Sequence, residues 1–147
     1  MTGDLQRFVD AQDPVYATVI AELRAGRKRS HWMWFVFPQH RALGRSAMAV
    51  RYGLASLAEA RDYAEHPVLG ERLRECADAM LAAPPELSAY AILGSPDDLK
   101  FRSSMTLFAL ALPEEKRFRT ALDRFYEGAL DDRTVEDRKS TRLNSSH

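Results

Sequence analysis

The sequence has a single cysteine, no long apolar run and no excess of charge of either sign. With Cys76 alone, no intrachain disulfide can form, which is typical of proteins from a reducing compartment. No apolar run approaches the ~20 residues that a membrane-spanning helix needs. The N-terminus lacks the basic and then apolar layout of a secretory signal. These absences predict a cytoplasmic protein that does not associate with membranes.

Acidic and basic residues balance to a formal net charge of zero at pH 7. A nucleic-acid-binding domain usually carries a basic excess, so we predict no dedicated binding of nucleic acid. The sequence contains no glycine-rich phosphate loop of the common types. Its native histidines, His31, His40 and His66, lack metal-ligand spacing with one another or with Cys76. We therefore predict no metal and no cofactor.

The last eleven residues, 137–147, resemble the conceptual translation of a common sequencing-adapter oligonucleotide. This resemblance implies that the segment is not native and that the natural C-terminus is missing. Its polar composition by itself predicts a disordered tail. Without the tail's three basic residues and one acidic residue the formal net charge is −2. We expect a single domain over residues 1–136.

Helix signals dominate the rest of the chain. Helix starts are predicted at Asp13, Ser46, Ser56 and Ser95, because each residue can cap the backbone amides of a first turn. Proline or glycine ends the segments that follow. A strand over residues 50–54 is a weaker alternative. The pattern predicts a compact all-α domain of about seven or eight short helices.

The most informative stretch is residues 31–40, which holds both tryptophans, Trp32 and Trp34, with polar groups such as His31 and Gln39 at its ends. Such a density of rings marks either the centre of a small core or an aromatic-walled pocket with a polar rim. Rings on every face of a short helix favour burial. The sequence leaves both interpretations open.

A second informative stretch follows Ser95. Asp97, Lys100 and Ser104 share one face of the helix predicted there, and Ser103 and Thr106 lie on adjoining faces. Free amides at a helix start, together with a lysine and hydroxyls, can receive an anion such as phosphate. The alternative is an ordinary capped helix with a surface ion pair worth a few tenths of a kcal/mol.

The residues of both stretches resemble those of a known family, the domain of unknown function 1810. The resemblance covers roughly residues 4–130 and rests on 31–39, Ser46, Tyr52, 59–73 and 94–108. It implies a small, predominantly helical and biochemically uncharacterised protein, for the most part bacterial. Some members carry the label "calpastatin", but calpastatin is a disordered inhibitor, whereas this chain has the apolar content and helix caps of a folded domain. The resemblance also implies that the polar residues of the two stretches occur together.

These observations lead to one functional hypothesis and one alternative. The hypothesis is an aromatic-lined pocket for a small anionic or nucleotide-like ligand, with His31 and Asp97 as the groups for any proton transfer. Amides after Ser95 would help to hold the anion. The predicted ligand-binding residues are Trp32, Trp34, Gln39, Lys100, Ser103, Ser104 and Thr106. The alternative is a non-enzymatic protein-interaction module in which the same residues form the core.

Overall fold

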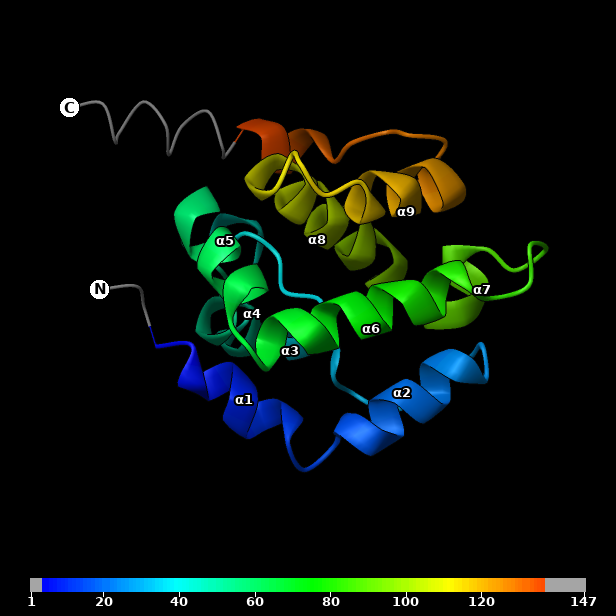
Figure 1. Ribbon diagram of the computed structural model, residues 1–147, viewed down its shortest axis with the longest axis horizontal. Coiled ribbons are helices and arrows are strands. Elements are labelled where there is room, and N and C mark those ends of the chain that lie inside the picture. Colours follow the sequence, from blue (N-terminus) through cyan, green and yellow to red (C-terminus); the bar gives the residue numbers. More distant parts are fainter. Residues whose placement is uncertain (1–3, 137–147) are drawn as a thin grey trace.

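The computed structural model describes residues 4–136, which fold into helices joined by short loops (Figure 1). The elements are α1 (Gln6–Gln12), α2 (Tyr16–Arg24), α3 (Met33–Val36), the 3₁₀ turn η1 (Arg41–Leu43), α4 (Ala47–Arg51), α5 (Leu57–Glu65), α6 (Leu69–Leu81), α7 (Ala89–Leu93), α8 (Asp97–Ala111) and α9 (Arg117–Tyr126). The predicted all-α class is confirmed. The described part holds more elements than the seven or eight expected, since η1 and a helical segment at residues 132–136 add to them. The predicted tail, 137–147, lies outside the described residues.

Two of the predicted helix caps form as the local sequence implies. The Ser46 hydroxyl accepts a hydrogen bond from the Ala49 amide at 3.1 Å and starts α4. The Ser56 hydroxyl accepts from the Glu59 amide at 3.1 Å, while the Glu59 carboxylate accepts from the Ala55 amide at 2.9 Å. Both caps use partners within four residues, so the local sequence is enough to predict them.

The other two predicted caps are wrong. Helix α2 begins only at Tyr16, because Asp13 pairs instead with Arg72, their charged atoms lying 2.9 Å apart. Helix α8 begins at Asp97 with Pro96 in the capping position, and the Ser95 side chain makes no capping bond. Tertiary contacts and turn geometry override the local signal at both positions.

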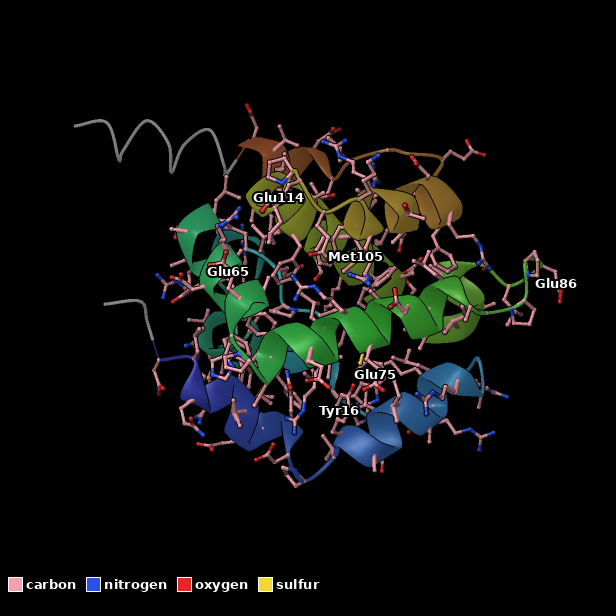
Figure 2. The ribbon with its side chains drawn as sticks, in the orientation of Figure 1. Tyr16, Glu65, Glu75, Glu86, Met105 and Glu114 are labelled. Carbon is pink, nitrogen blue, oxygen red and sulfur yellow. The ribbon has the colours of Figure 1, made fainter. Side chains whose placement is uncertain are left out.

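The centre of the molecule is α8, which is buried on most of its faces and packs against α5, α7 and α9. Figure 2 places Met105 of this helix in the middle of the bundle, and its side chain is fully buried. Phe101 and Phe108 of the same helix are also fully buried and contact rings from α5, α9 and the segment after α3. Burial of each such ring contributes roughly 1.5–3 kcal/mol, so α8 organises the core.

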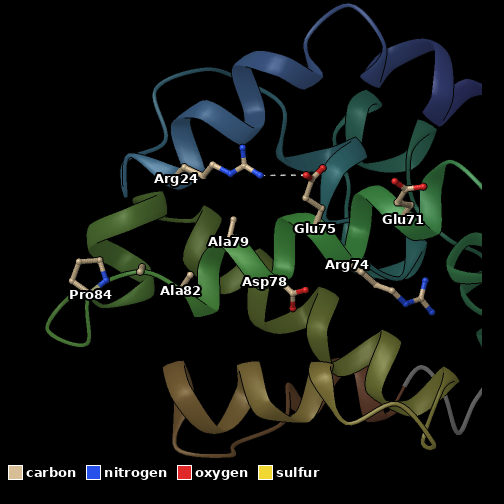
Figure 3. Close-up of a pocket in the computed structure, with 9 residues that line it drawn as sticks. Arg24, Glu71, Arg74, Glu75, Asp78, Ala79, Ala82 and Pro84 are labelled. Carbon is tan, nitrogen blue, oxygen red and sulfur yellow. Dashed lines mark hydrogen bonds and ion pairs between the residues drawn. The ribbon is translucent and has the colours of Figure 1, made fainter.

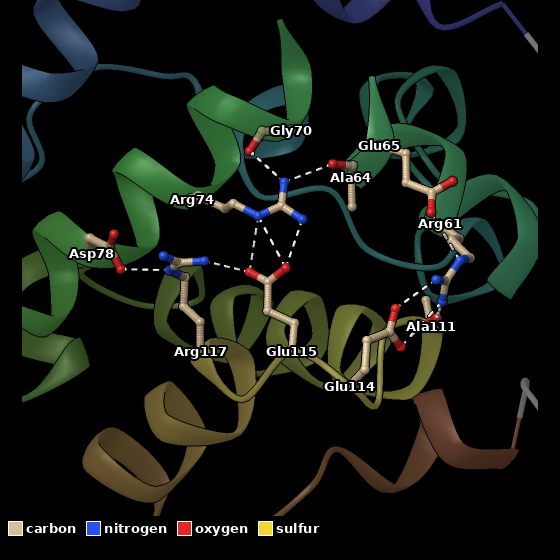
Figure 4. Close-up of polar contacts among 10 residues, drawn as sticks. All are labelled: Arg61, Ala64, Glu65, Gly70, Arg74, Asp78, Ala111, Glu114, Glu115 and Arg117. Atoms are coloured by element: carbon tan, nitrogen blue, oxygen red, sulfur yellow. Dashed lines mark hydrogen bonds and ion pairs between the residues drawn. The ribbon is translucent and has the colours of Figure 1, made fainter. Parts of the chain in front are cut away.

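Long helix α6 packs against α2, α5 and α9 and is fastened to the start of α9 by charged side chains (Figure 4). The Arg74 guanidinium donates to both oxygens of Glu115 and to the backbone carbonyls of Ala64 and Gly70. Arg117 donates to Asp78 at 2.7 Å and to Glu115 at 2.5 Å. These bonds join α6 to the segment that leads into α9.

The predicted alternative of a strand over residues 50–54 is not found. Leu54 instead makes one isolated parallel bridge with His40. In this bridge the Leu54 amide donates to the Gln39 carbonyl at 3.0 Å, and the Arg41 amide donates to the Leu54 carbonyl at 2.8 Å. The bridge holds the segment after α3 beside the loop after α4. It thereby places α4 next to the aromatic stretch.

Within residues 4–136, every helix is too short or too polar to cross a bilayer.

Candidate functional site

Two lysines from distant parts of the chain meet at one aspartate. The Lys28 ammonium lies 2.9 Å from Oδ2 of Asp97, and the Lys100 ammonium lies 3.8 Å from Oδ1. The side chains of Lys28, Asp97 and Lys100 are 7%, 19% and 25% exposed. Lys28 belongs to the loop after α2, whereas the other two begin α8. Ion pairs sheltered to this degree are screened less by salt than those on an open surface.

Each of these lysines also contacts a tryptophan ring. The Lys28 ammonium lies 5.0 Å from the centre of the Trp32 ring, and the Lys100 ammonium lies 4.9 Å from that of Trp34. Both distances are within the range of a cation–π interaction. The structure therefore brings together Trp32, Trp34, Asp97 and Lys100, which the sequence placed in two separate stretches.

Glu22 of α2 fixes the loop that carries Lys28 and Trp32, and sequence reasoning missed it. One carboxylate oxygen accepts from the Trp32 indole at 2.9 Å and from the Arg29 amide at 2.9 Å. The other accepts from the Ser30 hydroxyl at 2.6 Å. Burial acts to raise the pKa of Glu22, but these bonds outweigh it and lower the pKa to about 2. Glu22 therefore remains ionised and holds the loop against α2.

A small cavity lies beside Trp34. Its walls are Met33, Trp34, Phe37, Gln39, Ala49, Tyr52, Gly53 and Lys100. Its volume of about 10 Å³ corresponds to the space that one water molecule needs. Three predicted ligand-binding residues, Trp34, Gln39 and Lys100, share these walls. Trp32 does not line the cavity, because its ring is 1% exposed and packs into the core.

Helix α4 and the loop after it supply Ala49, Tyr52 and Gly53 to the walls of this cavity. Ala49 is the only residue of α4 that is buried, and Met48 and Val50 are exposed. The chain approaches itself closely at Gly53, where a Cβ atom would lie 2.5 Å from the Cα atom of Arg41. Only glycine permits that approach. This wall is thus closely fitted at Gly53, where Arg7 of α1 also donates to the carbonyls of Arg51 and Gly53, while α4 itself buries only one side chain.

Of the three predicted hydroxyl groups, two have partners within the fold. The Ser103 hydroxyl donates to the Leu99 carbonyl at 3.2 Å. The Thr106 hydroxyl donates to the Arg102 carbonyl at 2.8 Å and accepts from the Asp131 amide at 2.9 Å. Ser104 differs from both, because its side chain is fully buried and its hydroxyl has no hydrogen-bond partner. Ser104 lies one turn beyond Lys100 on the same face of α8.

Most of the amides after Ser95, which the sequence predicted would help to hold an anion, already have acceptors within the chain. The Asp98 amide donates to the Gly94 carbonyl at 2.8 Å. The Leu99 and Lys100 amides both donate to the Pro96 carbonyl, at 3.0 Å and 3.1 Å. These donors are used by the turn that precedes α8, in which Gly94 adopts a φ of +78°. Any anion here would depend on side chains rather than on the start of the helix.

His31 lies in the loop before α3 with an exposed side chain. Within residues 4–136 it forms no hydrogen bond or ion pair with Asp97 or Lys100. Its assignment with Asp97 to proton transfer stays a prediction.

Comparison with known proteins identifies the family. A family model described as "Protein of unknown function (DUF1810)" matches residues 2–137. The chain belongs to the DUF1810 family. Its fold is similar to the crystal structure of the conserved hypothetical protein Rv1873 from Mycobacterium tuberculosis, with a TM-score of 0.88 and 55% sequence identity, over 90% of this chain and 94% of that one. Among curated proteins no significant match is found.

The charge distribution of this DUF1810 chain is uneven around the aromatic stretch. Between Glu22 and Glu59 the sequence has no acidic residue, although the whole chain is neutral. The same segment carries seven basic residues, namely Arg24, Arg27, Lys28, Arg29, Arg41, Arg45 and Arg51. It supplies α3, α4 and most walls of the small cavity. Two of these charges have partners in the fold, since Arg24 pairs with Glu75 and Lys28 pairs with Asp97.

A larger cavity of this DUF1810 domain, about 560 Å³ in volume, lies along α6 (Figure 3). Its walls are Arg24, Glu71, Arg74, Glu75, Asp78, Ala79, Ala82, Ala83 and Pro84. Most of these charged groups already have partners in the fold. Arg24 pairs with Glu75 at 3.3 Å, and Asp78 pairs with Arg117 at 2.7 Å. Because charges of both signs neutralise one another here, the groove offers no clear chemical preference.

Proposed function

We propose that this DUF1810 domain binds a small organic anion that carries a flat ring, such as a nucleoside monophosphate. The ring would stack on Trp34, and the negative group would contact Lys100. The observation that carries the proposal is the position of the Lys100 ammonium, 4.9 Å from the Trp34 ring centre and in the wall of the same cavity as Gln39. Stacking surface, positive charge and an amide are the three features that a nucleotide-like molecule requires.

The surrounding charge supports an anionic ligand. Asp97 supplies one negative charge against the two positive charges of Lys28 and Lys100. The segment between Glu22 and Glu59, which supplies most of the cavity walls, carries seven basic residues and no acidic one. An anion therefore gains favourable interactions at long and short range. The cytoplasmic location predicted from the sequence fits a metabolite of this kind.

Binding an organic ligand requires the cavity to widen, because its volume of about 10 Å³ is far smaller than a ring. Helix α4 is the element best suited to move, since it has five residues and buries only Ala49, and its displacement breaks the two hydrogen bonds from Arg7 to the carbonyls of Arg51 and Gly53. Elements with few buried apolar contacts open at the lowest free-energy cost. Displacement of α4 and Gly53 would expose the face of Trp34 next to Lys100 and Gln39.

Titration of the full chain with adenosine 5′-monophosphate tests the proposal, followed by intrinsic tryptophan fluorescence and by the change in Tm. Adenosine and ribose 5-phosphate, titrated separately, report on the ring and on the anion. We expect a saturable signal that is strongest for the complete nucleotide. Trp34→Phe should remove the fluorescence change while Trp32 still reports folding.

Lys100→Met should abolish the response while keeping the apolar stem of the side chain. Lys116→Met is the matched control, because Lys116 is exposed at the start of α9. The proposal is wrong if none of the three compounds binds, or if the control variant loses binding as Lys100→Met does. An absence of binding together with a co-purifying protein would favour the interaction module instead.

A further inference from the structure

We infer that the ligand's negative group is a phosphoryl group and that Asp97 competes with it for Lys28 and Lys100. The inference rests on the proposed function and specifies its ligand class and its regulation. Asp97 occupies the position between the two ammonium groups, at 2.9 Å from one and 3.8 Å from the other. In this view the carboxylate and the phosphoryl group exclude each other from that position.

The balance of charge supports a phosphoryl group. One carboxylate leaves the two lysines with a surplus of one positive charge, in a place where Lys28 is only 7% exposed. A phosphomonoester carries about −1.5 to −2 charges at pH 7 and matches both lysines together. A carboxylate ligand would offer no more charge than Asp97 already does, so it would displace Asp97 with little gain.

The choice of lysine also points to phosphate. The full sequence has only four lysines, Lys28, Lys100, Lys116 and Lys139, among 21 basic residues. Within residues 4–136, every other ion pair with a carboxylate uses arginine, as in Arg74 with Glu115 and Arg117 with Asp78. The planar arginine fork matches a planar carboxylate, whereas the lysine ammonium acts as a point charge that suits a tetrahedral group. Two lysines on one carboxylate therefore depart from the pattern of this fold.

Ser104 provides an independent indication. Ser103 and Thr106 each bond to the carbonyl four residues earlier, whereas the buried hydroxyl of Ser104 has no partner. A buried polar group without a partner costs free energy, so it requires an explanation such as a ligand or a water. Ser104 follows Lys100 by one turn on the same face of α8 but lies outside the walls of the small cavity, so a phosphoryl oxygen would reach its hydroxyl only after the site opens.

Asp97 keeps part of its stabilisation when it leaves the lysines. It is the first residue of α8, where the helix dipole stabilises a negative side chain whether or not a lysine is near. The carboxylate therefore keeps a favourable position when a phosphoryl group takes the two ammonium groups. A carboxylate whose only partners were the lysines would lose all of its stabilisation, whereas Asp97 keeps its interaction with the helix dipole.

The test compares wild-type protein with Asp97→Asn and Asp97→Ser, using calorimetric titration with inorganic phosphate and with adenosine 5′-monophosphate. Removal of the competing carboxylate should tighten binding of both probes by about tenfold, which is the usual scale for one close charge. Lys28→Met and Lys100→Met should lose binding of inorganic phosphate. Lys116→Met should behave as the wild type.

Failure of this inference can be told from failure of the proposed function. If wild-type protein binds adenosine 5′-monophosphate and Asp97→Asn binds it more weakly or equally well, the proposed function stands and the competition is refuted. If neither protein binds either probe, both proposals fail. Weaker binding by Asp97→Asn would instead make Asp97 a direct ligand contact.

A measurement on wild-type protein covers the case in which the Asp97 variants do not fold. Acetylation of lysines by an N-hydroxysuccinimide ester, followed by mass spectrometry, gives a rate for each lysine. Saturating phosphate should slow modification of Lys28 and Lys100 at least about fivefold and leave Lys116 unchanged, because a bound anion blocks the ammonium groups. Equal rates with and without phosphate would overturn the inference.

Discussion

The Lys28 ammonium lies 2.9 Å from the Asp97 carboxylate, and this contact joins the loop after α2 to the first residue of α8. Sixty-nine positions separate the two residues in the sequence. The pair sits between the Trp32 ring, which Lys28 contacts, and Lys100, which also faces Asp97. This structural contact therefore adjoins the candidate ligand site through Lys100.

Lys28→Met should lower the free energy of unfolding by about 1–3 kcal/mol, because it leaves a largely buried carboxylate with Lys100 alone. Urea denaturation of Lys28→Met, Asp97→Asn and the double variant measures the coupling between the two residues. Lys116→Met should change stability by less than about 0.5 kcal/mol. A coupling of zero between Lys28 and Asp97 would contradict the structure.

Glu22 should make the protein sensitive to acid. Its pKa of about 2 in the fold lies below the ordinary value of 4.5, so its ionised form stabilises the fold above pH 4.5. This contribution is lost as the pH falls from about 4.5 toward 2. Glu22→Gln should cost about 1.5–3 kcal/mol at pH 7, the scale of hydrogen bonds to a charged group.

Urea denaturation of wild type and Glu22→Gln at pH 7 and pH 3 checks this prediction. The difference between the two proteins should shrink at the lower pH, because at pH 3 the Glu22 carboxylate of the unfolded chain is mostly protonated while that of the folded protein is mostly ionised, and this favours unfolding of the wild type. The matched control is Glu86→Gln, whose side chain is exposed in the loop between α6 and α7 (Figure 2). A constant difference across this pH range would refute the role of the Glu22 charge.

Ser104→Ala and Thr106→Val should have opposite consequences for stability, although both residues are fully buried on α8. Ser104→Ala removes a hydroxyl that has no partner and should leave stability unchanged or slightly higher. Thr106→Val removes two hydrogen bonds and leaves the Asp131 amide without its acceptor, at a cost of about 1–3 kcal/mol. Thermal unfolding of the two variants decides the matter, and equal losses would show that the hydroxyl of Ser104 has an internal partner.

Arg74→Lys should destabilise the contact between α6 and the segment before α9. Arginine donates there to Glu115 and to the carbonyls of Ala64 and Gly70 at once, which a lysine cannot reproduce (Figure 4). We expect a loss of about 1–2 kcal/mol in urea denaturation. Arg61→Lys, at the more exposed pair with Glu114, should lose less. Because Arg61 also donates to a backbone carbonyl, that of Ala111, equal losses would show that the greater burial of Arg74 adds nothing to its contribution.

The sequence was sufficient for features whose partners lie a few residues away. The caps of Ser46 and Ser56 and the segments 57–65 and 89–93 follow from such contacts, as does the fold class. Asp13 and Ser95 failed as caps because an ion pair with Arg72 and the turn at Pro96 offered better alternatives. Local patterns carry no information about these competitors.

For the candidate site, the sequence by itself determined which residue types were present: two tryptophans, a glutamine and a helix face with Asp97, Lys100 and Ser104. Only the tertiary structure decided how they meet. It buried Trp32, left Ser104 without a partner, gave the hydroxyls of Ser103 and Thr106 to the backbone, and added Lys28 and Glu22. The physical reason is that ion pairs, ring contacts and buried hydrogen bonds join residues far apart in the chain, and folding alone sets those distances.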